Sequence, residues 1–179
     1  MTCIAGWAEN RKVVIGGDSA GIGGFDLCIR KDSKVFKNGP FLFGFTSSFR
    51  MGQLLRFSFV PPSQDEEQTV YGFMCTTFID EIRKCLKDGG FSEIDNNQES
   101  GGQFLVAYKG RLFKIDGDFQ VGESVDKFDA CGSGESFAIG ALNVLNESSK
   151  SPKEKVRIAL ETAHAYCIGV RPPFNFVEN

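Results

Sequence analysis

Several features that mark particular classes of protein are missing from this 179-residue chain. Its Lys and Arg residues are spread along the sequence and its formal net charge is -3, so we expect no nucleic-acid partner and no polybasic membrane contact. No apolar run approaches the roughly 20 residues of a membrane-spanning helix. The N-terminus also lacks the charged and apolar regions of a secretory signal. We therefore expect a cytoplasmic protein without a membrane partner.

Metal and cofactor signatures are missing as well. The six cysteines contain no CxxC pair, and an even number of cysteines is weak support for disulfides in a chain of this size. They are interpreted as reduced core residues. No ATP-binding motif occurs, and the sequence predicts neither a metal site nor a bound cofactor.

The composition that remains is that of an ordinary globular protein. Hydrophobic residues make up 41% and charged residues 24% of the chain. Its length fits one domain over residues 1–179, and no internal repeat is visible. Phenylalanine is unusually frequent, with 18 residues against three tyrosines and one tryptophan. Either the core is rich in Phe, or part of this set contacts another subunit or lines a substrate pocket.

Turn residues and apolar spacing divide the chain into strands and helices. Strands are expected at 3–7, 13–17, 27–36, 41–45, 104–108, 112–115, 119–121, 128–131 and 174–177, and helices at 49–57, 71–88, 137–145 and from 152 towards 171. The last helix has the clearest start, because Ser151, Pro152 and Glu154 form a capping box with proline at the first helical position. This order predicts an α+β fold, a four-layer αββα sandwich.

The candidate chemistry begins at Thr2. Loss of Met1 from in front of this small residue leaves a threonine whose hydroxyl and α-amino group belong to one residue. An α-amino group has an unperturbed pKa of about 7.7 to 8.0, so part of it is a free base at neutral pH. A threonine activated by its own amine is a known nucleophile. The expected strand at 13–17 ends in the pair Gly16 and Gly17, which allows a close approach of the backbone. This predicts that Asp18, at the end of that strand, lies beside Thr2 at the start of its partner strand.

A set of short segments runs through the chain: 2–5 (TCIA), 13–18 (VVIGGD), Lys34 with Val35, 44–47 (GFTS), 132–134 (GSG), 159–161 (ALE) and Cys167 with Ile168. In these segments the sequence resembles the β subunits of the proteasome, and more closely the bacterial peptidase HslV. The likeness runs nearly from end to end. It implies an N-terminal-nucleophile (Ntn) hydrolase with the αββα fold.

Carried over to this chain, the resemblance implies a catalytic role for each of five residues. Thr2 is the nucleophile, Lys34 lowers the pKa of its hydroxyl, and Asp18 holds Lys34. Ser133 binds the α-amino group and helps to relay the proton. The amide of Ser47 occupies the place of the oxyanion donor, where the family usually has glycine. The chemistry requires the Lys and Asp independently, because an ammonium favours the alkoxide and a desolvated lysine needs a carboxylate to stay charged.

Two positions depart from the family pattern. Ala165 and Ile168 stand where the family commonly has an aspartate and, in proteasomes, a serine. His164, next to this gap, is interpreted as a structural residue on the flank of an apolar helix. Cys3 is interpreted as a buried strand residue because it has no free amine of its own to act as base.

The function predicted from these residues is a threonine endopeptidase that cleaves peptide bonds through an acyl-enzyme on Thr2. The resemblance implies peptide or unfolded-protein substrates, a homo-oligomeric ring or stacked rings, and a separate AAA+ ATPase as a partner. Two alternatives stay open: an Ntn amidohydrolase that acts on a small amide, and a self-assembling structural homologue with an impaired site. The positions of Ala165 and Ile168 favour the second alternative.

Overall fold

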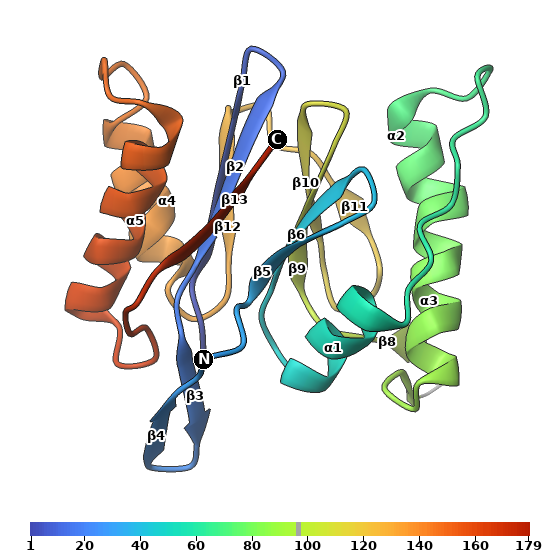
Figure 1. Ribbon diagram of the computed structural model, residues 1–179, viewed down its shortest axis with the longest axis horizontal. Coiled ribbons are helices and arrows are strands. Elements are labelled where there is room, and N and C mark those ends of the chain that lie inside the picture. Colours follow the sequence, from blue (N-terminus) through green and yellow to red (C-terminus); the bar gives the residue numbers. More distant parts are fainter. Residues whose placement is uncertain (96–97) are drawn as a thin grey trace.

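The chain forms four layers in the order helices, sheet, sheet, helices (Figure 1). This computed structural model describes residues 1–95 and 98–179. The predicted α+β fold and its αββα layering are therefore confirmed. Among the described residues, no helix has the length and apolar character needed to cross a membrane.

The first sheet has four antiparallel strands in the order β12, β1, β2 and β13. Their bounds are β1 (Ile4–Glu9), β2 (Lys12–Gly17), β12 (Phe128–Cys131) and β13 (Asn175–Glu178). β1 and β2 form the predicted hairpin, whose turn residues Asn10 and Arg11 both have positive φ, 53° and 64°. Its register pairs Ile4 with Gly17, so the chain that leaves β2 passes next to Thr2.

The second sheet has five strands in the order β11, β10, β9, β6 and β5. Their bounds are β5 (Val35–Asn38), β6 (Phe41–Phe45), β9 (Phe104–Tyr108), β10 (Arg111–Ile115) and β11 (Val121–Gly122). The extended structure predicted over residues 27–36 is confirmed only at its two ends, in β4 (Asp26–Ile29) and β5, and is wrong for residues 30–34. The chain leaves strand geometry after Ile29, and Lys34 lies in the loop just before β5.

Two helices cover the outer face of the first sheet, α4 (Glu135–Val144) and α5 (Pro152–Tyr166). The capping box of α5 is present as predicted: Ser151 Oγ accepts from the Glu154 N–H, and the Glu154 carboxylate accepts from the Ser151 N–H. Small and aliphatic residues of both helices, among them Ala138, Leu160 and Ala163, pack on β1 and β12. These helices therefore hold the strand that begins next to Thr2.

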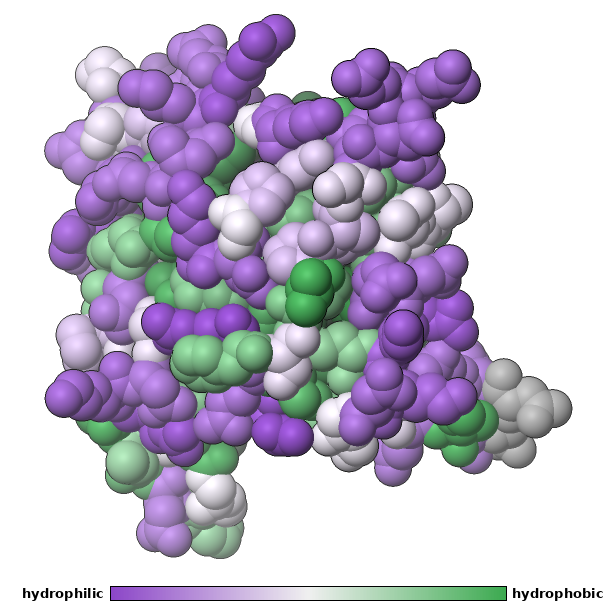
Figure 2. All heavy atoms as spheres, turned by 45° about the vertical axis from the view of Figure 1, so that its right-hand side comes forward, coloured by the Kyte–Doolittle hydropathy of each residue, from purple (hydrophilic) through white to green (hydrophobic). Residues whose placement is uncertain are grey.

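The outer face of the second sheet is covered by α1 (Phe49–Phe57) and by a longer helix in three parts. That helix runs from α2 (Val70–Phe73) through a π-helical turn, η1 (Met74–Phe78), into α3 (Ile79–Asp88). It occupies the place of the amphipathic helix predicted from the spacing of apolar residues. In a view turned so that this side comes forward, hydrophilic residues cover most of the margins and hydrophobic residues are visible across the middle (Figure 2).

Phenylalanine fills the layer between the second sheet and its helices. The buried members of this cluster are Phe36, Phe41, Phe43, Phe45, Phe59, Phe73, Phe78, Phe104, Phe113 and Phe119. Phe41 stacks on Tyr108 with ring centroids 4.4 Å apart, and on Phe78 at 4.9 Å. Most of the unusual Phe content is thus core, although Phe25, Phe57 and Phe137 remain exposed.

Two short hairpins lie outside the main sheets. The first, β3 (Ala20–Gly23) and β4 (Asp26–Ile29), projects from the body below the N-terminus (Figure 1). It exposes the side chains of Phe25, Leu27 and Ile29. The second consists of β7 (Glu93–Asp95) and β8 (Gln98–Ser100).

The two sheets touch closely at Gly44, and this contact gives a test of the fold. A Cβ atom at Gly44 would lie 2.5 Å from Ile4 Cγ2 and 2.7 Å from Ile15 Cγ2, on the facing sheet. We expect Gly44→Ala to lower the free energy of unfolding by about 1 to 3 kcal/mol in urea denaturation, because the core would be overpacked. Gly140→Ala is the matched control. It has open space at its Cβ in α4 and should raise stability by about 0.5 to 1 kcal/mol. Equal effects of the two substitutions would contradict this sheet packing.

Candidate active site

Thr2 lies two residues before β1, and its side chain is almost fully buried. Its backbone N–H donates to Ser133 Oγ at 3.1 Å, and its hydroxyl donates to the carbonyl oxygen of Met1 at 2.5 Å. Once Met1 is removed, the same nitrogen would be the α-amino group. The nitrogen and the hydroxyl of Thr2 therefore each have a polar partner.

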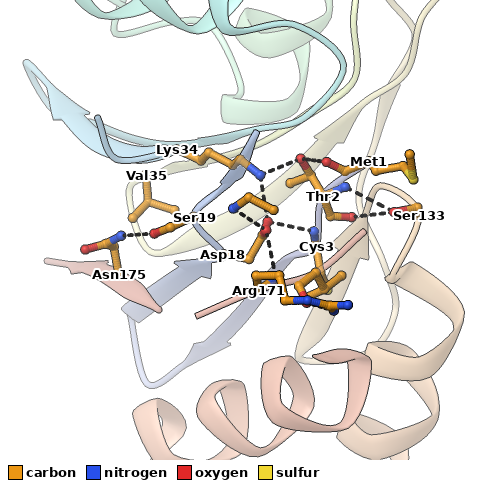
Figure 3. A network of polar contacts seen from close by, with 12 residues as sticks. Met1, Thr2, Cys3, Asp18, Ser19, Lys34, Val35, Ser133, Arg171 and Asn175 are labelled. Atoms are coloured by element: carbon orange, nitrogen blue, oxygen red, sulfur yellow. Dashed lines mark hydrogen bonds and ion pairs between the residues drawn. The ribbon is translucent and has the colours of Figure 1, made fainter. Parts of the chain in front are cut away.

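Lys34 joins Thr2 to Asp18 (Figure 3). Its Nζ donates to Thr2 Oγ1 and to Asp18 Oδ1, both at 2.8 Å. The exposed fractions of the two charged side chains are 2% for Lys34 and 0% for Asp18. The three residues that the sequence placed together thus form one continuous chain of contacts, although they come from the start of β1, the end of β2 and the loop before β5.

Asp18 is held by backbone groups from three directions. Its Oδ1 accepts from the Cys3 N–H at 3.1 Å, and its Oδ2 accepts from the N–H groups of Ala20 at 2.9 Å and Arg171 at 3.3 Å. A buried carboxylate needs such donors to replace water. They also fix the direction in which Asp18 faces Lys34.

Burial lowers the pKa of Lys34 from its usual value of 10.5, and the charge and hydrogen bond of Asp18 act in the opposite direction. Arg30 adds a smaller lowering effect. An ammonium 2.8 Å from Thr2 Oγ1 stabilises the alkoxide form of that oxygen. The arrangement can therefore make the Thr2 hydroxyl more acidic.

Ser133 lies in a turn that wraps the Thr2 backbone. Besides accepting from Thr2 N–H, its hydroxyl donates to the Thr2 carbonyl at 3.3 Å, and the Gly134 N–H donates to the same carbonyl at 3.1 Å. Gly132 adopts a φ of 97° and lies so close to the Thr2 carbonyl that a side chain would not fit. The turn fixes both ends of the Thr2 residue.

Ser47 adopts a left-handed conformation with a φ of 64°, which is unfavourable by roughly 1 to 2 kcal/mol for a residue other than glycine. This explains in physical terms why glycine suits the position. The Ser47 hydroxyl offsets part of that cost by accepting from the Gln103 N–H at 3.0 Å. Its own N–H donates to no acceptor among the described residues.

A cleft of about 320 Å³ opens beside these residues. It is lined by residues 20–23 and 45–49, together with Met1, Thr2, Cys28, Arg30 and Lys34. The β3–β4 hairpin forms one wall, and the segment between β6 and α1 forms the other. Thr2, Lys34 and Ser47 reach this cleft. Asp18 contacts Lys34 and Ser133 contacts Thr2, but neither Asp18 nor Ser133 lines the cleft itself.

Other residues considered from the sequence have structural partners. Cys3 and Cys131 are buried, burial raises the pKa of both thiols, and all six cysteines are free. His164 contacts the Val170 carbonyl through Nδ1 at 2.9 Å. Within residues 1–95 and 98–179, no three His, Cys, Asp or Glu residues are grouped as a metal site requires.

Near the end of α5, the residue that contacts the site is Cys167, whereas the resemblance had drawn attention to Ala165 and Ile168. Ala165 and Ile168 are exposed, and the side chain that reaches the site is Cys167, whose thiol donates to Ser133 Oγ at 3.5 Å. Sequence reasoning also missed the backbone contact of Arg171 and the links made by Gln103. The one signal for Cys167 was its place within the matched segment. Arg171 and Gln103 had none, because their contacts come from segments distant in the sequence.

These layers and this arrangement at the start of the first strand define a class: the fold is that of the proteasome-like Ntn hydrolases. The resemblance drawn from the sequence is confirmed at this level. No protein-family model matches the chain, and no curated protein matches it in sequence.

Solved structures of this class cover nearly the whole chain. BPH of Thiobacillus denitrificans matches with a TM-score of 0.83 and 20% identity, over 99% of this chain and 97% of that one. A second BPH structure is a complex with epoxomicin. HslV from Trypanosoma brucei matches with a TM-score of 0.69 and 18% identity, over 99% and 98% of the two chains. Anbu from Yersinia bercovieri, described as an ancestral beta-subunit, has a TM-score of 0.67 and 12% identity, over 99% and 81%. At these identities the likeness concerns the fold, and activity has to be argued from the site.

The buried ion pair gives a stability test. Asp18→Asn would leave the Lys34 ammonium buried without a counter-charge, so we expect the free energy of unfolding to fall by about 3 to 5 kcal/mol in urea denaturation at pH 7. Asp32→Asn makes the same chemical change in an exposed pair with Arg30 and should remove less than about 1 kcal/mol. Similar losses in the two variants would contradict the burial of the Lys34 and Asp18 pair.

Proposed function

We propose that this chain is a threonine endopeptidase in which Thr2, freed by removal of Met1, attacks the peptide bond. The observation that carries the proposal is the 2.8 Å contact between Lys34 Nζ and Thr2 Oγ1, with Asp18 behind the lysine. A buried ammonium aimed at a hydroxyl beside an open cleft is expected of an activated nucleophile.

In the proposed reaction, the α-amine of Thr2 accepts the hydroxyl proton as Oγ1 attacks the carbonyl carbon of the substrate. Lys34 stabilises the developing alkoxide, and the N–H of Ser47 donates to the oxyanion. The amine then passes its proton to the leaving nitrogen, which breaks the peptide bond and leaves an ester on Thr2. Water, activated by the same amine, hydrolyses the ester and restores the hydroxyl. Ser133 keeps the amine in place through both halves of the cycle.

The proposal extends to an assembly. Exposed apolar side chains gather on the β3–β4 hairpin, at Phe25, Leu27 and Ile29, and at the ends of α4 and α5, where Phe137 stacks on Tyr166 with centroids 5.9 Å apart. Such groups on a monomer surface are typical of subunit contacts. They support a homo-oligomeric ring or stacked rings. We propose further that the substrate is a peptide or an unfolded protein and that a separate AAA+ ATPase supplies it.

A reagent that requires both groups of the terminal threonine tests the chemistry. We expect the intact mass of the purified protein to lack Met1 and to gain one epoxomicin, because an epoxyketone reacts with a hydroxyl and an amine on one residue. Thr2→Ala should abolish the adduct. Cys28→Ala is the matched control for a competing nucleophile in the cleft and should keep it.

Each other outcome selects an alternative. Retained Met1, or processed protein without an adduct, would contradict the peptidase and favour the structural homologue with an impaired site. An adduct accompanied by hydrolysis of small amides, but of no peptide in a panel, would favour the amidohydrolase.

The charges of the cleft predict its preference. Both charged residues that line it, Arg30 and Lys34, are cations. Arg30 is fixed by two 2.7 Å hydrogen bonds to Asp32 and by its place over the Phe49 ring, 4.0 Å from the centroid. Its Nη1 has no partner in the part of the chain that the structure describes. A substrate carboxylate can therefore receive a charge-assisted hydrogen bond there.

We expect peptides with Glu before the scissile bond to be cleaved about tenfold more efficiently, in kcat/KM, than otherwise identical peptides with Gln, a difference of about 1.4 kcal/mol. Arg30→Met should bring this ratio close to one. Arg56→Met removes another arginine that lies over a Phe ring, outside the cleft, and should keep the ratio. An unchanged ratio in Arg30→Met would overturn the assigned preference while leaving the peptidase proposal intact.

A further inference from the structure

Gln103 connects the two loops that hold the reacting groups. It lies immediately before β9, the central strand of the second sheet, and no sequence motif marked it. Its backbone N–H donates to Ser47 Oγ at 3.0 Å, and its carbonyl accepts from the Thr46 N–H at 3.1 Å. The backbone of residue 103 thus fixes the loop that carries the proposed oxyanion donor.

The side chain of Gln103 reaches the other loop. Its Oε1 accepts from the Gly132 N–H at 3.3 Å. Gly132 begins the turn whose next two residues, Ser133 and Gly134, hold the nitrogen and the carbonyl of Thr2. One residue therefore sets the separation between the Ser47 amide and the Thr2 amine.

The amide of Gln103 is oriented by a third segment. Its Nε2 donates to Asp116 Oδ1 at 2.6 Å. Asp116 follows β10 and is itself fixed, since its N–H donates to the Gln120 carbonyl and its carbonyl accepts from the Phe119 N–H. Because the Nε2 group is committed to a carboxylate, the carbonyl end of the amide faces Gly132.

We infer that Gln103 is a positioning residue, which acts by holding the Gly132–Gly134 turn at a set distance from the Ser47 loop. This inference rests on the proposed function. A shift of about 1 Å between a nucleophile and the groups that stabilise its transition state can slow a reaction about 100-fold. The hydrogen bond from Gly132 to the Gln103 side chain restrains such a shift.

The structure also supplies a rescue. Gln103→Glu alone places a second carboxylate against Asp116, which is unfavourable because like charges repel. Asp116→Asn alone leaves an oxygen that can still accept from Gln103. In the double variant Q103E/D116N, the carboxylate introduced at position 103 accepts from both the Gly132 N–H and the new amide at position 116. The network is then restored with its polarity reversed.

The experiment measures kcat, KM and the rate of epoxomicin adduct formation, each per folded molecule and well below the unfolding temperature of each variant. Gln103→Met and Gln103→Glu should lower kcat and the adduct rate by about 10- to 100-fold while KM changes by less than about twofold. Asp116→Asn and the double variant should stay within about threefold of the wild type. Gln68→Met is the matched control. It removes another Gln side-chain hydrogen bond, from Nε2 to Thr76 Oγ1, in a segment that does not line the cleft, and should leave the rates unchanged.

The outcomes separate this inference from the proposed function. Wild-type protein that forms an adduct, together with Gln103→Met that forms it equally fast, overturns the positioning role and leaves the peptidase standing. The positioning role is also overturned if the loss of kcat and adduct rate is no greater than the loss of folded protein. It is overturned as well if the double variant does not recover kcat and the adduct rate. If Gln103→Met does not fold, the comparison of Gln103→Glu with the double variant decides. Wild-type protein without an adduct overturns both proposals.

Discussion

The buried contact between Lys34 and Asp18 is the constraint on which the rest of the site depends. Two charges that water cannot reach are tolerated only when they face each other and when the remaining lone pairs of the carboxylate are satisfied. Three backbone N–H groups meet that need, and they come from the residue before β1, from the start of β3 and from the segment after α5. Satisfying one carboxylate therefore brings together segments that are far apart in the chain.

The fold makes this burial possible by placing the site at the margin between two sheets. Gly44 lets the sheets approach, and the Phe-rich layer keeps the second sheet rigid against its helices. Thr2 leads into the first sheet, whereas Lys34 leads into the second. The proposed nucleophile and the group that would lower its pKa thus precede strands of different sheets. Their 2.8 Å contact therefore depends on how closely the two sheets pack.

Two residues in the loops around Thr2 have backbone conformations that most side chains disfavour, and each has a feature that lowers the cost. Gly132 and Ser47 both have positive φ, at 97° and 64°. Gly132 has no Cβ to clash with the Thr2 carbonyl, whereas Ser47 gains a hydrogen bond to its hydroxyl. Strained backbone next to a buried ion pair is common where a protein holds groups ready for chemistry. The thiol of Cys167 contacts Ser133 Oγ close to the Thr2 nitrogen, and Ala165 supplies no carboxylate where the family commonly has an aspartate.

The sequence by itself determined the layers and the candidate nucleophile. Local signals were sufficient there: turn residues between strands, the capping box of α5, the spacing of apolar residues, and the matched spacing of Thr2, Asp18 and Lys34. Only the tertiary structure decided that Lys34 lies in a loop, that Cys167 reaches Ser133, and that Gln103 joins two loops. These contacts join residues separated by up to 56 positions, and no local pattern encodes them, because they depend on how distant segments pack.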